Sequence, residues 1–184
     1  MTTPTTESYF PGDPPPKEQI ARILRVDHAG EYGAIRIYEG QLAVLGNASC
    51  SPLLRQMQKQ EQEHLAAFNM LLVERRVRPT ALLPLWHIAG FVLGAATAAM
   101  GERAAMACTV AVEEAIDAHY ARQAHALGQN EQKLRETIEA FRGDELEHRD
   151  IGLAHGAEET PGYRVLSALI KAGCRVAIAL SERL

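Results

Sequence analysis

The stretches EQEH, at residues 61–64, and ELEH, at residues 145–148, are two copies of the pattern Glu-x-x-His within segments of helical periodicity. Residues three positions apart share one face of a helix, so each copy presents a carboxylate and an imidazole to the same point. A further glutamate lies 30 or 32 residues before the first glutamate of each copy, at Glu31 and Glu113. Four glutamates and two histidines are the ligand set of a carboxylate-bridged di-iron or di-manganese site in a four-helix bundle.

Proline and glycine positions divide the chain into the helices that carry these residues. We expect helices from Lys17 to Leu45, from Ser51 to about Arg76, from Leu85 to the break at residues 128–130, from there to Gly156, and from Val165 to Leu180. Ser51 is expected to be an N-cap residue before a proline at the first helical position. No segment alternates as a strand does. The expected fold class is therefore all-α: a ferritin-like four-helix bundle with an additional apolar C-terminal helix.

Size and composition limit the domain organisation and the partners. A chain of 184 residues can build one substantial core, and we expect a single ferritin-like di-iron domain at residues 17–184. Residues 1–16 hold five of the nine prolines and four threonines, so we expect a flexible tail there. The net charge of −4 argues against nucleic acid as a partner.

Helical spacing places all six candidate ligands in the stripe of each helix that faces the core. They are Glu31, Glu61, His64, Glu113, Glu145 and His148. Four ionised glutamates in one core repel each other and two divalent cations neutralise them, so we expect a metal pair. The first three residues are expected around one ion and the last three around the other, with Glu61 and Glu145 as the better candidates for bridging. Carboxylate and imidazole ligands suit iron and manganese. Taken singly, a Glu-x-x-His pair is more often a solvated pair on a charged face.

Other polar residues near these positions have more than one interpretation. Asp144 and Asp27 are candidates to accept a hydrogen bond from a ligand histidine. The pair His119-Tyr120 lies two turns beyond the third glutamate, where it either packs in the core or takes part in electron transfer or substrate binding. His28 is expected to be a hydrogen-bonded core histidine rather than a seventh ligand.

The segment Ala81–Met100 contains twenty residues, and only His87 among them is ionisable. It is long enough for a membrane span, but it continues without a stop signal into the helix that supplies a metal ligand. We therefore expect an interfacial segment or the wall of a hydrophobic substrate channel, with an ordinary buried helix as the alternative. The apolar helix Val165–Leu180 carries Lys171 and Arg175, as expected of a helix lying against anionic lipid. Both segments favour a lipophilic substrate drawn from a bilayer.

Six stretches carry a resemblance to a known family. They are RVDHAGEYGAIRIYEGQLAVLG (Arg25 to Gly46), EQEHLAAFN (Glu61 to Asn69), RVRPTALLPLWHIAGFVLGAATA (Arg76 to Ala98), AMACTVAVEEAIDAHY (Ala105 to Tyr120), FRGDELEHRDIGLAH (Phe141 to His155) and AGCRVAIALSERL (Ala172 to Leu184). Together they closely resemble the demethoxyubiquinone hydroxylase family of ubiquinone biosynthesis. The resemblance implies that the family's six iron ligands fall on the six candidate residues, and that its histidine-tyrosine pair falls on His119 and Tyr120.

The same resemblance implies an activity and its partners. The expected enzyme is an O2-dependent monooxygenase with two iron ions that hydroxylates a polyprenylated methoxy-benzoquinol. Peripheral binding to membrane lipid is implied, and the lack of an Arg-rich presequence favours the cytoplasmic face of a bacterial cell membrane. An external reductant must supply two electrons, because no GxGxxG fingerprint is present; NADH and the quinol itself both stay open. A homo-oligomer or a ubiquinone-biosynthesis complex also stays open.

Three other functions fit parts of the pattern. A ferritin-like ferroxidase or iron-binding protein uses the same bundle and nearly the same ligands, but it needs a polar route to the metals, whereas this chain offers the apolar segment. A rubrerythrin-like peroxidase needs a module with four cysteines, and the chain has three scattered ones. A non-catalytic lipid-binding or scaffold protein leaves four core-facing glutamates unexplained.

Overall fold

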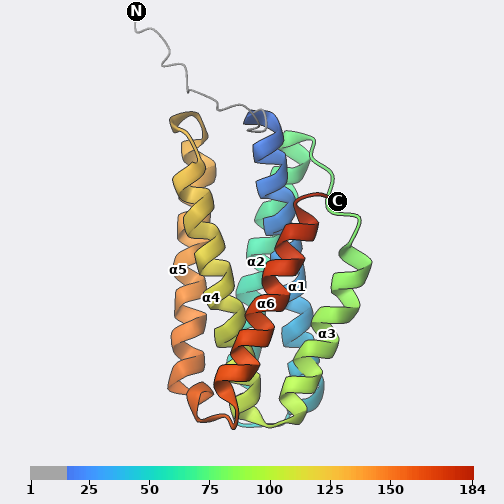
Figure 1. Cartoon of the computed structure of the whole chain (residues 1–184), viewed down its shortest axis with the longest axis vertical. Helices are drawn as coiled ribbons and strands as arrows, with labels where there is room; N and C mark the ends of the chain where they lie inside the picture. Colours follow the sequence, from blue (N-terminus) through green and yellow to red (C-terminus); the bar gives the residue numbers. More distant parts are fainter. Residues whose placement is uncertain (1–15) are drawn as a thin grey trace, which may run out of the picture.

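The computed structural model describes residues 16–184, and all regular structure in that range is helical (Figure 1). The α-helices are α1 (Pro16–Leu45), α2 (Ser51–Arg75), α3 (Leu83–Ala99), α4 (Glu102–Ala126), α5 (Gln132–Ala154) and α6 (Tyr163–Ser181), with short 3-10 helices η1 (Gln129–Glu131) and η2 (Ala157–Glu159). The expected flexible tail at residues 1–16 lies, apart from its last residue, outside the described residues.

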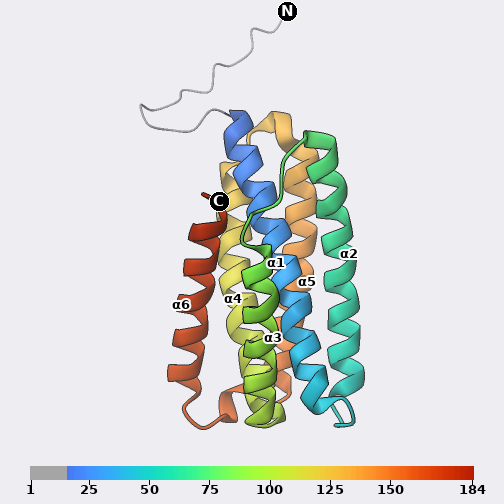
Figure 2. The same ribbon diagram turned by 90° about the vertical axis from the view of Figure 1, so that its right-hand side faces the viewer.

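Four of the helices form the bundle and two lie outside it. α1 pairs with α2 and α4 pairs with α5, while α3 packs on α1 and α6 packs on α4. Figures 1 and 2 show α3 and α6 on the same side of the bundle, over the face made by α1 and α4. The expected four-helix bundle with an additional C-terminal helix is confirmed, with α6 as that helix.

The sequence-based prediction of one long helix through residues 85–127 is wrong. The chain turns after α3, where Gly101 has φ of 113°, a conformation that side-chain-bearing residues rarely adopt. Because of this turn, α3 lies outside the four-helix bundle and packs on α1. Two helix starts also differ from the prediction: Cys50 rather than Ser51 precedes α2, and α6 begins at Tyr163.

α3 approaches α1 through glycines, so the two backbones lie very close. A Cβ atom at Gly94 would lie 1.9 Å from the carbonyl oxygen of Ile37, and one at Gly40 would lie 2.1 Å from that of Phe91. Side chains on the outer face of α3, such as Leu85 and Ile88, are left exposed. Within residues 16–184, no helix combines the length and hydropathy that a bilayer crossing requires.

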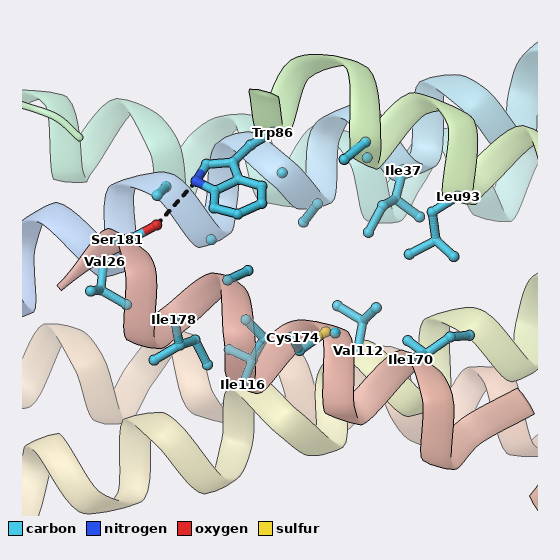
Figure 3. A pocket seen from close by; sticks show the side chains of 18 of the residues that line it. Val26, Ile37, Trp86, Leu93, Val112, Ile116, Ile170, Cys174, Ile178 and Ser181 are labelled. Carbon is cyan, nitrogen blue, oxygen red and sulfur yellow. Dashed lines mark hydrogen bonds between the residues drawn. The ribbon is translucent and has the colours of Figure 1, made fainter. Parts of the chain in front are cut away.

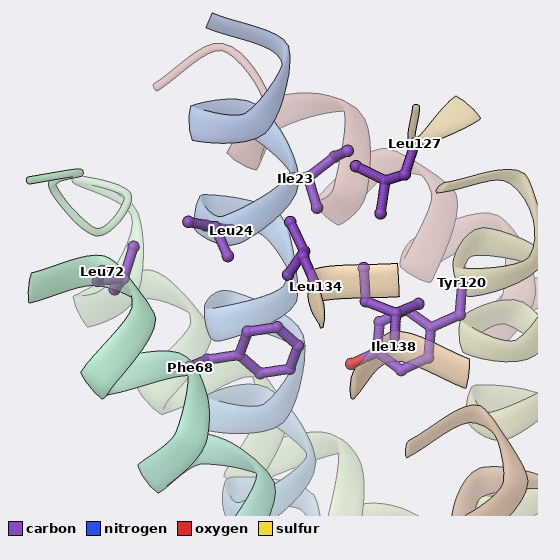
Figure 4. Close-up of a cluster of buried hydrophobic side chains, with 8 residues drawn as sticks. All are labelled: Ile23, Leu24, Phe68, Leu72, Tyr120, Leu127, Leu134 and Ile138. Atoms are coloured by element: carbon purple, nitrogen blue, oxygen red, sulfur yellow. The ribbon is translucent and has the colours of Figure 1, made fainter. Parts of the chain in front are cut away.

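Two apolar layers fill the bundle above and below its middle. Figure 4 shows the first layer, whose side chains come from all four bundle helices: Ile23, Leu24, Phe68, Leu72, Tyr120, Leu127, Leu134 and Ile138. The second layer consists of Tyr38, Cys50, Leu54, Met57, Met106, Ala107, Val110 and Ala157. On α1, α2 and α4 the candidate ligands lie in sequence between residues of the two layers, and on α5 they lie between Ile138 of the first layer and Ile151, which packs against the second. The layers therefore separate the polar middle of the bundle from its two ends.

Candidate metal centre

The structure brings all six sequence-predicted ligand candidates together in the middle of the bundle. Glu31 comes from α1, the EQEH pair from α2, Glu113 from α4 and the ELEH pair from α5. Each of the six residues is at most 3% exposed. The neighbouring acids Glu63 and Glu147 are exposed, as the helical spacing predicts. Carboxylates are almost never buried without partners, so this gathering requires a chemical explanation.

The six side chains divide into two overlapping groups of four. The first group is Glu31, Glu61, His64 and Glu145, and the second is Glu61, Glu113, Glu145 and His148. Within each group, one potential ligand atom from every residue lies within 4.8 Å of the others. Glu61 and Glu145 belong to both groups, which is the position that bridging carboxylates take between two ions.

Both histidines turn the same ring nitrogen toward the carboxylates. His64 Nδ1 lies 3.4 Å from Glu31 Oε2 and 3.3 Å from Glu145 Oε1. His148 Nδ1 lies 3.1 Å from Glu61 Oε1 and 3.4 Å from Glu145 Oε2. The two Nδ1 atoms therefore lie where each would complete one group of four.

The opposite nitrogen of each ring has a partner on a neighbouring helix. His64 Nε2 lies 3.0 Å from Asp144 Oδ2, and His148 Nε2 lies 3.0 Å from Gln60 Oε1. Each Nε2–H donates to an oxygen, which fixes the ring orientation and leaves Nδ1 for a metal ion. Asp144 thus accepts a hydrogen bond from a ligand-candidate histidine, which is the role considered for it from the sequence. Gln60 was not identified, because its partner lies 88 residues away on another helix.

The polar atoms of the cluster fit a metal pair better than they fit each other. Five of them are buried without a hydrogen-bond partner: Glu31 Oε2, Glu61 Oε1, Glu145 Oε2, His64 Nδ1 and His148 Nδ1. Leaving buried polar atoms unpaired is costly, about 1–3 kcal/mol each. Carboxylate oxygens and imidazole nitrogens converging at this spacing are suitable ligands for iron or manganese. The residues present therefore fit two divalent cations.

Burial and neighbouring side chains shift the pKa values of the carboxylates in the cluster in different directions. Burial, followed by repulsion from Glu145, raises the pKa of Glu61 well above its ordinary 4.5, and the same two causes act on the pKa of Glu113. Burial also acts to raise the pKa of Glu145, but close contacts from His148 and His64 outweigh it and lower the pKa to about 2. Burial acts to lower the pKa of His64, but the facing carboxylates raise it to about 10. The cluster without metal therefore retains protons that incoming cations would displace.

Two tyrosines donate hydrogen bonds to Glu31 and Glu113, the two carboxylates that each belong to only one group of four. Tyr120 donates its hydroxyl proton to Glu31, and Tyr38 donates to Glu113 across 3.2 Å. Burial and the nearby carboxylates raise the pKa of both phenols well above 10. Both hydroxyls therefore stay protonated and act as donors. Tyr120 was singled out from the sequence, whereas Tyr38 was not.

His119 does not contact the cluster directly. It is buried beside Gln123 and Asp27, with its Nε2 atom 2.7 Å from Gln123 Nε2. Asp27, which was considered as a partner for a ligand histidine, contacts this network and neither of the two ligand candidates. His28 pairs through Nε2 with Asn69 Oδ1 at 3.1 Å, as expected of a hydrogen-bonded core histidine.

A cavity of about 510 Å³ lies between α1, α3, α4 and α6 (Figure 3). Its walls are almost entirely apolar, and the larger lining side chains are Val26, Ile37, Trp86, Leu93, Val112, Ile116, Leu166, Leu169, Ile170 and Ile178. Gly30 and Val112 line it and directly precede Glu31 and Glu113, so the cavity borders the turns that carry two carboxylates. Trp86 Nε1 donates to Ser181 Oγ at 3.0 Å and so links α3 to α6.

Known proteins are similar in sequence to this chain over nearly its whole length. The 3-demethoxyubiquinol 3-hydroxylase of Rhodospirillum rubrum is 59% identical over 180 residues, which cover 97% of this chain and 85% of that protein. The human mitochondrial NADPH-dependent 3-demethoxyubiquinone 3-hydroxylase is 57% identical over 90% of this chain and 78% of its own length. The mitochondrial 5-demethoxyubiquinone hydroxylase of Saccharomyces cerevisiae is 42% identical, with the same two shares.

The family comparison agrees with these relatives. The family described as ubiquinone biosynthesis protein COQ7 matches residues 18–181. This range contains all six residues of the cluster and the four bundle helices, apart from the first two residues of α1. The chain therefore belongs to the ubiquinone biosynthesis protein COQ7 family.

Proposed function

We propose that this chain is an O2-dependent di-iron monooxygenase that hydroxylates a polyprenylated 5-methoxy-2-methyl-benzoquinol, demethoxyubiquinol, in ubiquinone biosynthesis. The observation that carries the proposal is the pair of four-residue groups sharing two glutamates beside an apolar cavity. The relatives from bacteria, animals and yeast are all named as hydroxylases of this type. A ferroxidase would need a polar approach to the metals, whereas this cavity is apolar.

The six residues of the cluster would hold two iron ions. Glu31 and His64 would bind one ion, Glu113 and His148 the other, and the two shared glutamates would bridge them. When bound, the iron pair supplies dioxygen activation and accepts the two electrons that the reaction consumes. Asp144 and Gln60 keep the imidazoles oriented through their Nε2–H groups.

The two candidate catalytic residues lie next to each other on α4. Tyr120 donates a hydrogen bond to Glu31 and so orients that carboxylate. The rings of His119 and Tyr120 are 6.5 Å apart between centroids, with no hydrogen bond between them. We infer that His119 and Tyr120 lie toward the substrate side of the centre, because both are one helical turn beyond Ile116, which lines the cavity.

The cavity would receive the quinol, with its ring toward Glu31 and Glu113. The isoprenoid tail would leave between α3 and α6, because both helices carry large exposed apolar side chains. On α6, Leu169 and Val176 are 67% and 58% exposed, and Arg164 and Arg175 are exposed beside them. An exposed apolar stripe flanked by cations suits an anionic bilayer surface. We infer peripheral binding at the cytoplasmic face of a bacterial membrane.

The electrons would come from outside the chain. The human and bovine relatives are named as NADPH-dependent, which supports a reduced nicotinamide as the source. All helices of residues 16–184 belong to the bundle or cover it, so no separate nucleotide-binding domain is built from these residues. The nicotinamide would therefore bind transiently or reduce the quinone first.

Isotope labelling tests the reaction. Iron-loaded protein, a short-tailed demethoxyquinone, NADPH and 18O2 should yield a hydroxylated quinol that carries one labelled oxygen, measured by mass spectrometry. Glu145→Gln should abolish product, while Glu147→Gln, an exposed glutamate two residues away, should retain it. Accumulation of ferric mineral without labelled product would identify a ferroxidase instead.

Vesicle flotation tests the membrane surface separately. Leu169→Glu places a charge within the exposed stripe of α6 and should abolish flotation with vesicles containing anionic lipid. Val73→Glu is the matched control, because Val73 is 81% exposed but lies on α2, away from α3 and α6. Equal flotation of the two variants would exclude α6 as the membrane contact.

A further inference from the structure

Three of the residues that line the apolar cavity are also exposed to solvent. They are Ala89 on α3 and Leu169 and Gly173 on α6. A residue that both lines a cavity and faces solvent lies where the cavity opens. Within residues 16–184, no Cα atom of α3 comes within 8 Å of one of α6, so the two backbones do not close this side. The cavity therefore opens sideways, between α3 and α6.

Larger side chains close both ends of this opening. At one end, Trp86 Nε1 donates to Ser181 Oγ at 3.0 Å and bridges the two helices (Figure 3). At the other end, Figure 3 shows Leu93 and Ile170, and Leu93 packs against the apolar cluster that contains Ile170. Ala89 lies between Trp86 and Leu93 along α3, about one turn from each. The opening is therefore limited to the middle of the cavity.

The α6 wall of the opening has its smallest residue at Gly173. Leu169 and Ala177 lie one turn before and after it and also line the cavity, so the three residues share one face of α6. A Cβ atom built at Gly173 would meet no atom within 4 Å, in contrast to Gly94, where the backbone of α1 lies against the glycine. Glycine destabilises a helix interior relative to alanine, and no close backbone contact requires it at Gly173. The missing side chain therefore leaves open space in the cavity wall.

The volume of the cavity gives this opening a use. A dry cavity of about 150 Å³ holds benzene, so 510 Å³ accommodates roughly 20 non-hydrogen atoms, which is the ring of the proposed quinol and about two isoprene units. The remainder of a longer tail has to pass out of the cavity. Ile88, next to Ala89, and Val176, one turn after Gly173, are exposed and apolar, so an emerging tail would stay in apolar surroundings.

We propose that the isoprenoid tail of the substrate leaves the cavity through a mouth formed by Ala89 and Gly173, and that the small size of these two residues determines whether quinols with tails longer than the cavity are accepted. This specificity role rests on the proposed function, in which the quinol ring occupies the cavity. A larger side chain in the mouth would exclude the emerging part of a long tail. It would still leave room for a quinol that fits entirely inside.

Quenching of tryptophan fluorescence by bound quinone tests the mouth without turnover. Trp86 is the single tryptophan of the chain and lines the cavity, so its emission reports binding there. The full chain would be loaded with zinc, which has no redox chemistry, and titrated to equilibrium in detergent with demethoxyquinones that carry one or four isoprene units. Both quinones should quench the wild-type protein. Absence of quenching by either one would refute the proposed substrate site and the mouth together.

Variants that fill the mouth test its role in tail selection. Gly173→Leu should raise the Kd of the four-isoprene quinone by about tenfold or more and leave the Kd of the one-isoprene quinone within about twofold. Ala89→Leu, on the opposite helix, should have the same effect. Ala96→Leu and Ala168→Leu are the matched controls, because both residues are exposed on the same two helices and neither lines the cavity; they should change neither Kd. If the wild-type protein binds both quinones and Gly173→Leu changes both Kd values equally, or changes neither, the mouth is refuted while the proposed substrate site stands.

Discussion

Gly94 makes the contact between α3 and α1 sensitive to a single methyl group. A Cβ atom there would lie 1.9 Å from the carbonyl oxygen of Ile37 and 2.8 Å from its carbon, and ordinary contact begins at 3.4 Å. In Gly94→Ala the helices must separate by about 1.5 Å, because backbone atoms cannot rotate aside as a side chain does. Ile37 and Leu93 line the cavity, so the separation should also alter its walls.

The expected destabilisation follows from two opposing effects. Overpacking against backbone should cost about 3 kcal/mol, the upper end of the usual range. Alanine gains about 1 kcal/mol over glycine in a helix interior. The net loss of about 2 kcal/mol should lower the Tm by roughly 4–8 °C in a domain of this size.

Gly143→Ala in α5 is the matched control. No atom lies within 4 Å of a Cβ built at Gly143, and its φ is ordinary for a helix. This variant should be more stable by about 1 kcal/mol, which raises the Tm by roughly 2–4 °C. Thermal unfolding followed by circular dichroism measures both changes. If Gly94→Ala were as stable as Gly143→Ala, the close backbone contact between α1 and α3 would be refuted.

Three further results are expected from the centre and the cavity. Glu113→Gln should retain about one iron per chain in elemental analysis and Glu145→Gln almost none, because Glu113 belongs to one group of four and Glu145 to both; equal losses would contradict the sharing. The pKa values of Glu61, Glu113 and His64 are higher in the folded chain than in the unfolded chain, so the Tm of chelated protein should fall as pH rises above 4.5. Added metal should remove that fall, and a pH-independent Tm of the chelated protein would argue against the buried cluster. A dry cavity of about 150 Å³ holds benzene, so 510 Å³ should hold roughly 20 non-hydrogen atoms, the ring and about two isoprene units. The kcat/KM in detergent should therefore level off at that tail length, and a continued rise would show a longer site.

The six ligand candidates could be found from the sequence because helical spacing alone predicts that each lies on the core-facing side of its own helix. Glu61 and His64 share a face by spacing, and a buried carboxylate among apolar residues is rare enough to be informative. The exposure of Glu63 and Glu147, which lie two positions from a ligand candidate in another helical direction, agrees with the same periodicity. These inferences need no knowledge of how the helices are arranged in space.

The features that were missed depend on contacts between helices. The break at Gly101 is not apparent locally, because the alanine-rich residues on both sides favour helix; the close fit of α3 on α1 accompanies the turn. The partners of His148 and His119 lie across helix interfaces or in the interior, at Gln60 and Asp27. Spacing along the chain does not specify which of many polar residues reaches them.

The exposure of Asp144 gives the two sides of the reaction centre different surroundings. Its side chain is 41% exposed and contacts His64, so on the side of α2 and α5 a single carboxylate stands between a buried imidazole and water. On the side of α1 and α4, the helical turns that carry Glu31 and Glu113 border the apolar cavity. In the proposed enzyme, protons would reach the centre from the solvent-exposed side at Asp144, while the lipophilic substrate would arrive through the apolar cavity. Protons and substrate would therefore use separate routes to the centre.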